Sequence, residues 1–160
     1  MEREERLVAA ATRGWLTAIT NAGVWFEART PEQMDQPIIP GKNRAFYIYG
    51  HLIALHDSMA HLIGLGHRTY EFLDPVFLTV PDRAAVRYPT LPELKAYWNE
   101  LHQRISDGIS TFTAEVWSLP HLGISEADFQ HSPWRNRFSV LLSRTNHLSM
   151  HMAQLRLTAE

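Results

Sequence analysis

The sequence predicts an all-α protein: a four-helix bundle in which a long crossover joins the second and third helices. Apolar residues recur at helical spacing in four segments, and no segment shows the alternation typical of strands. A connection of roughly 25 residues with several prolines separates the second segment from the third. Because so long a connection can run back along a helix, it favours the order up-down-down-up.

The first two helices have clear ends in the sequence. The first is expected from about Glu2 to Arg29, and the P-I-I-P-G segment at residues 37 to 41 ends that region. Asn43 is a suitable N-cap for the second helix, and Gly64 and Gly66 are suitable residues to end it.

The last two helices are bounded in the same way. T-L-P-E opens the third helix, with Thr90 and Glu93 at capping-box spacing, and its apolar stripe continues to Val116. The fourth is expected from about Trp134 to Leu157. Between residues 118 and 133 a local start signal predicts a short extra helical turn.

Composition limits the classes of protein. The 160 residues are expected to form one domain, 1–160, with 45% apolar and 20% charged residues. The absence of cysteine excludes disulfide scaffolds, thiolate metal sites and cysteine nucleophiles. A net charge of −2, with Lys42 and Lys95 the only lysines, argues against nucleic-acid binding. The charged first residues and the lack of an apolar run of ~18 residues predict a cytoplasmic protein without a signal peptide or membrane span.

Two of the nine histidines stand four residues apart in T-N-H-L-S-M-H-M-A-Q-L, residues 145 to 155. On a helix this spacing separates side chains by ~40° and ~6 Å, so His147 and His151 can share a metal ion. Both lie at the flank of the apolar stripe. That position suits ligands in a pocket wall and equally suits half-exposed surface histidines.

His51, at one edge of the second helix's apolar stripe, is the third candidate ligand, although a single histidine there is commonly a satisfied core residue. It lies ~12 Å from the start of its helix, and the midpoint of His147 and His151 lies ~12 Å from the end of theirs. The three imidazoles therefore share one level if these helices run antiparallel, which is the arrangement that the long crossover favours.

Other polar residues receive a structural or surface interpretation by default. Asp57 is expected on the polar side of the second helix as a solvated carboxylate. The remaining histidines are interpreted as surface or structural residues: His56, His61, His67, His102, His121 and His131. Three arginines near the fourth helix, at positions 135, 137 and 144, either bind an anionic substrate or form a solvated basic end of the bundle.

G-H-L-I-A-L-H-D at residues 50 to 57, followed by S-R-T-N-H-L-S-M-H-M-A-Q-L at 143 to 155, resembles the DinB/YfiT-like metalloenzyme family. The resemblance extends from about Asn43 to the C-terminus and is less specific in the first helix. It implies a four-helix bundle with a crossover, commonly dimeric, and a divalent metal on three histidines. Carried over to this chain, the ligands would be His51, His147 and His151, and the metal nickel or zinc, with iron or manganese as alternatives.

Three neutral imidazoles leave a coordination position open, as reactive metal sites do. Leu148 stands where an H-E-x-x-H protease has its glutamate, so peptide hydrolysis by that mechanism is not expected. His56, Asp57 or a residue of the crossover could accept a proton or supply a fourth ligand, and the sequence does not choose. Asn146 and Gln154 could support the ligands or orient substrate, or only pack.

Two functions from different classes follow. The first is a metal-dependent enzyme acting on a small molecule, either a hydrolase or, as the resemblance implies for some relatives, a transferase of low-molecular-weight thiols. The second is a non-catalytic helical dimerisation or binding module with a structural metal. In both cases the resemblance predicts a homodimer, with no nucleic-acid or membrane partner.

Overall fold

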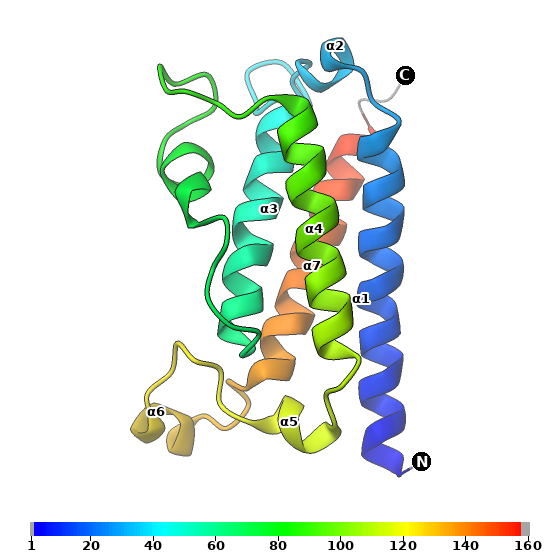
Figure 1. Ribbon diagram of the computed structural model, residues 1–160, viewed down its shortest axis with the longest axis vertical. Helices are drawn as coiled ribbons and strands as arrows, with labels where there is room; N and C mark the ends of the chain where they lie inside the picture. Colours follow the sequence, from blue (N-terminus) through cyan, green and yellow to red (C-terminus); the bar gives the residue numbers. More distant parts are fainter. Residues whose placement is uncertain (1, 158–160) are drawn as a thin grey trace.

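The computed structural model describes residues 2–157, and within them it contains no strand, which confirms the all-α prediction. The long helices stand side by side in Figure 1, and each packs against two of the others. Their bounds are α1 (Arg3–Glu27), α3 (Ala45–Leu62), α4 (Leu91–Ile109) and α7 (Arg137–Arg156).

The direction of the helices determines which of their residues can meet. In Figure 1, α1 and α7 rise while α3 and α4 descend, and the connection between α3 and α4 returns along the outside of α3. Helix α3 packs against both α4 and α7. The first half of α3 therefore lies at the same level as the second half of α7.

Short helical segments fill the connections. They are α2 (Pro31–Met34), the 3₁₀ turn η1 (Glu71–Leu73), the π-helical turn η2 (Pro75–Thr79), α5 (Ala114–Ser118) and α6 (Glu126–His131). The expected extra turn between residues 118 and 133 is α6, which Ser125 caps by accepting a hydrogen bond from the Asp128 backbone N–H.

Several helix ends differ from the prediction. The third helix ends at Ile109 and not at Val116, because Thr113 caps α5 as a separate helix. The predicted N-cap Asn43 was wrong: Arg44 occupies that position, and its backbone N–H donates to Asp82 in the crossover. The fourth helix begins at Arg137, three residues after the expected start, where the preceding Asn136 side chain accepts the capping hydrogen bond.

A glycine in α3 allows the crossover to pack closely against this helix. A Cβ at Gly50 would lie 2.3 Å from the ring of Phe77, so only glycine lets this fully buried phenylalanine approach α3 so closely. Phe77 belongs to η2, which packs on α3. The close approach therefore places the Phe77 backbone beside residue 51.

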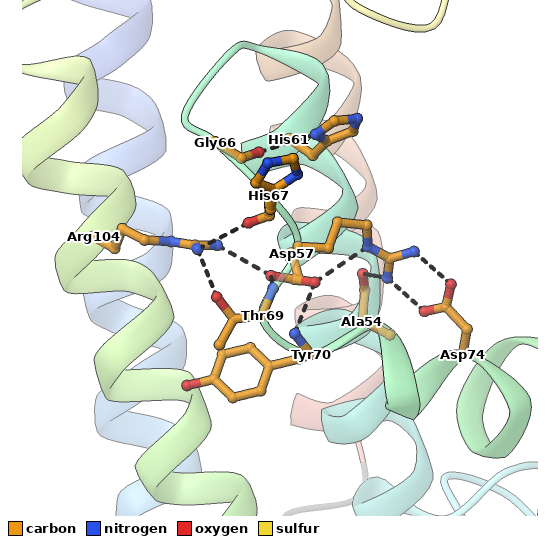
Figure 2. Close-up of polar contacts among 10 residues, drawn as sticks. Ala54, Asp57, His61, Gly66, His67, Thr69, Tyr70, Asp74 and Arg104 are labelled. Carbon is orange, nitrogen blue, oxygen red and sulfur yellow. Dashed lines mark hydrogen bonds and ion pairs between the residues drawn. The ribbon is translucent and has the colours of Figure 1, made fainter.

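The start of the crossover is held by Asp57, which Figure 2 shows between Arg104 of α4 and the chain at Thr69 and Tyr70. The carboxylate is fully buried. It accepts hydrogen bonds from two backbone N–H groups, both at 3.0 Å, and from Arg68 and Arg104 at 3.2 and 3.1 Å. The prediction of a solvated Asp57 was wrong, because the crossover folds over this side of α3 and brings its N–H groups to the carboxylate.

Candidate metal centre

The three predicted ligand residues come together between α3 and α7. The Nε2 atom of His147 lies 3.4 Å from Nε2 of His51 and 3.1 Å from Nε2 of His151. One ligand atom from each of the three residues lies within 4.8 Å of those of the other two, and all three side chains are half-buried. Helices α3 and α7 run antiparallel in Figure 1, and this course lets a residue in the first half of α3 meet residues in the second half of α7.

Hydrogen bonds on the far side of two rings determine how their nitrogens are protonated. His51 Nδ1 lies 3.1 Å from the backbone carbonyl oxygen of Phe77, and His151 Nδ1 lies 2.9 Å from the Gln154 side-chain oxygen. Because both partners only accept, each Nδ1 carries the proton and donates it. A neutral ring has a single N–H, so Nε2 of His51 and Nε2 of His151 both present lone pairs to the shared space.

This arrangement fits a divalent metal ion. His147 Nε2 has close contacts with two lone pairs but can carry at most one proton. Without a cation, therefore, only one of the two contacts has a hydrogen atom to form a hydrogen bond. Ligand nitrogens about 2.0–2.1 Å from a tetrahedral zinc stand about 3.3 Å apart, close to the distances observed. The residues present therefore fit a metal held by three imidazoles, and among residues 2–157 no carboxylate joins the cluster.

The surroundings keep the three rings neutral. Burial, followed by the neighbouring His151, His51 and Arg144, lowers the pKa of His147 to about 4. Burial is also the main cause that lowers the pKa of His51 and of His151. Neutral imidazole is the form that binds metal, so at pH 7 the ligands need not release protons before binding.

A comparison with protein-family models decides the family. The model of the DinB superfamily matches residues 10–155, which include every residue of the cluster. The chain belongs to the DinB superfamily. No curated protein matches the sequence significantly. In the part of this DinB-superfamily chain that the structure describes, no helix is long and apolar enough to cross a membrane.

A second pair of imidazoles lies in the protein core, with His56 on α3 and His102 on α4. His56 is fully buried and His102 is 6% exposed, so these two are interior residues and not surface ones. His102 Nδ1–H donates to the Trp98 carbonyl oxygen at 2.8 Å, and His56 Nδ1–H donates to His102 Nε2, also at 2.8 Å. The indole ring of Trp15 contacts His56 edge-on at 4.9 Å. The pair is a hydrogen-bonded link between α3 and α4.

The remaining candidates divide clearly. Gln154 supports a ligand, whereas Asn146 is exposed. Asp57 has its oxygens occupied by the four donors described above, so it is not free to accept a proton from a substrate. The other four histidines stand outside the cluster as expected: His61 and His121 are half-buried, and His67 and His131 are exposed.

Sequence reasoning missed one functional group, the carbonyl of Phe77. A backbone carbonyl has no side-chain signature, and its use depends on the course of the crossover. The only signal in the sequence was Gly50 immediately before His51, which is needed to admit the Phe77 ring.

Proposed function

We propose that this DinB-superfamily chain is a metal-dependent enzyme that acts on a small molecule, as a hydrolase or as a transferase of low-molecular-weight thiols. The observation that carries the proposal is the convergence of three Nε2 atoms from His51, His147 and His151. Nickel or zinc is the proposed metal, with iron or manganese as alternatives. We further propose that α1, α3, α4 and α7 form the family's up-down-down-up bundle in a single domain, and that the protein is a cytoplasmic homodimer.

The protein's own residues have three tasks in this proposal. The Phe77 carbonyl and Gln154 hold the rings of His51 and His151 with their lone pairs directed inward. The half-buried position of all three histidines keeps the centre reachable from solvent while lowering its polarity. A divalent metal bound there would supply Lewis acidity, which polarises a substrate oxygen or favours a thiolate over a thiol.

The alternative is a binding module with a structural metal. Structural zinc sites are commonly closed by four protein ligands, whereas open sites keep a position for water or substrate. Among residues 2–157 the cluster contains three ligand residues and no fourth, which supports the enzyme.

Metal content of tag-free protein tests the proposal, with the parent measured beside His147→Ala. As a matched control, His131→Ala removes an exposed imidazole that bonds only to its own helix. We expect about one divalent metal per chain in the parent and the control, and none in His147→Ala. Loaded protein would then be screened with thiol-transfer and hydrolytic substrates. Equal, negligible metal in all three after incubation with nickel, zinc, iron and manganese would overturn the metal centre, and loaded protein inactive on both substrate classes would favour the binding module.

A further inference from the structure

The candidate metal centre has no negative charge of its own. Its ligands are three neutral imidazoles, and their hydrogen-bond partners are a backbone carbonyl and an amide side chain. Among the described residues, no carboxylate shifts the pKa of His51, His147 or His151. With a divalent ion in place, the centre would carry a net charge of about +2 that no described acidic residue offsets.

Arg144 adds another positive charge to the same region. It precedes His147 by three residues on α7, so the two side chains are neighbours on one face of the helix, about 5–6 Å apart at Cβ. Its positive charge contributes to the lowered pKa of His147 and of His51. The guanidinium therefore acts on ligands from both helices.

The side chain of Arg144 is half-buried, and its Nε atom is buried without a hydrogen-bond partner among the described residues. Two other partly buried arginines have carboxylate partners: Arg44 pairs with Asp35 and Asp82, and Arg68 with Asp57 and Asp74. Arg137 is half-buried and resembles Arg144 in that its Nε is also buried without a hydrogen-bond partner among the described residues. Arg144 has no such partner within residues 2–157, and burial lowers its pKa. A desolvated guanidinium without an anion is costly, so the fold maintains a charge that a ligand can neutralise.

We propose that Arg144 is the anion-binding group of this centre, and that the ligand is a bifunctional small molecule. One atom of that molecule takes the open metal position, while a carboxylate or phosphate on the same molecule pairs with the Arg144 guanidinium. The inference rests on the proposed metal centre and narrows its substrate class to anionic molecules. A planar guanidinium suits these groups because it can donate two parallel hydrogen bonds to one oxyanion.

Two thiols that differ in charge test this subsite: 3-mercaptopropionate carries a carboxylate, and 2-mercaptoethanol carries a hydroxyl. Each is titrated into cobalt-loaded protein, and binding is followed by the thiolate-to-cobalt absorption band. The quantity compared between variants is the ratio of the two dissociation constants, because the difference in basicity between the two thiols is the same in every variant and cancels in that comparison. The variants are Arg144→Gln, Arg144→Lys and Arg156→Gln. The last makes the same charge change at an exposed position on the same helix.

We expect the parent and Arg156→Gln to share a preference for the carboxylate thiol. That preference should fall at least ten-fold in Arg144→Gln and by less in Arg144→Lys. Metal content and circular dichroism of each variant confirm that the fold and the centre persist. An unchanged preference in loaded Arg144→Gln would overturn the anion subsite and leave the metal centre standing. Parent protein that takes up no metal would instead overturn the metal centre, and this inference with it.

Discussion

Two groups of histidines in this protein lie on neighbouring helices and differ in how their nitrogens are used. In the core pair, each N–H meets an acceptor in sequence, from His56 to His102 to the Trp98 carbonyl. In the triad, the Nδ1–H groups of His51 and His151 point outward. Their Nε2 lone pairs point into the space that the three rings share. The pair is a hydrogen-bonded chain, whereas the triad directs two lone pairs into a shared space where a cation would bind.

The comparison shows that neither burial nor proximity of imidazoles identifies a metal site. The pair is more deeply buried than the triad and has the shorter nitrogen–nitrogen distance, 2.8 Å against 3.1 and 3.4 Å. What distinguishes the triad is the state of the nitrogens that face one another: in the pair an N–H of His56 meets the lone pair of His102, whereas in the triad the lone pairs of His51 and His151 both face His147 Nε2. Removing one residue from each group should therefore affect different properties.

The largest expected effect is the loss of metal affinity in His51→Ala. Two remaining imidazoles on one helix leave an incomplete site, so we expect the affinity for zinc to fall at least ~1000-fold, equivalent to about 4 kcal/mol. In the parent, free metal at about 100 times its dissociation constant should stabilise the fold by about 2.7 kcal/mol. Chelator competition measures the affinity, and thermal unfolding with and without metal measures the stabilisation.

The matched control for this experiment is His67→Ala, which removes an exposed histidine at the start of the crossover. Metal should stabilise the control as it does the parent. If His51→Ala keeps the parent's affinity, the metal does not bind at the triad.

The next effect concerns stability in His56→Ala. The change removes a fully buried ring and leaves His102 Nε2 without its donor, so we expect a loss of about 3–4 kcal/mol in the free energy of unfolding. Metal stoichiometry should stay at the parent value. Urea unfolding and metal analysis on the same sample give both quantities. A folded variant that has lost its metal would show that the core pair belongs to the centre and does not differ from the triad in function.

The features of the fold and of the candidate site that could be predicted from the sequence are mainly those that lie within one helix. The placement of His147 and His151 on one side of their helix, the capping box at Thr90 and the all-α class follow from local spacing, and the structure bears them out. The level of His51 required an assumption about helix direction, which the length of the crossover supplied. These predictions depended on helical geometry and, for His51, on the length of the crossover.

Features made by the crossover could not be predicted in the same way. The sequence predicts a solvated Asp57 because this residue lies on the polar side of its own helix. The chain that covers it comes from residues 68–70, which the pattern of that helix does not include. The carbonyl of Phe77 and the burial of His56 against Trp15 likewise depend on tertiary packing. A helical wheel assigns faces but does not show which loop or helix covers each of them.

The pH dependence of stability provides a separate test of the core pair. Burial lowers the pKa of His102 from 6.5 to about 4. Between these values the unfolded chain binds more protons than the folded one, so the free energy of unfolding falls as the pH drops from about 6.5 to about 4 and is unaffected above that window. At about 1.4 kcal/mol per pKa unit, His102 alone accounts for about 3 kcal/mol.

Urea unfolding of metal-free protein at pH 7, 6, 5 and 4 measures this dependence in the parent and in His102→Leu. The parent should lose stability more steeply with acid, because leucine removes the group that must take up a proton on unfolding. Burial also lowers the pKa of His147 to about 4, so the triad contributes its own slope, which remains in the variant. Burial also lowers the pKa of His56, which remains in the variant, so equal slopes in the two proteins would show only that protonation of His102 is not linked to unfolding.

The smallest expected effect comes from Gln154→Ala, which leaves all three ligands in place. Without the side-chain oxygen that accepts from His151 Nδ1–H, the ring can take either tautomer. One of the two hydrogen bonds that fix ring tautomers in the triad is then lost. We expect the metal affinity to fall about 10-fold, at the lower end of the range for such supporting residues, with the fold's stability unchanged in metal-free protein. Gln154→Glu should restore or increase the affinity, since a carboxylate accepts the same hydrogen bond and adds negative charge. Chelator competition on both variants separates this account from simple packing, which would weaken binding in both.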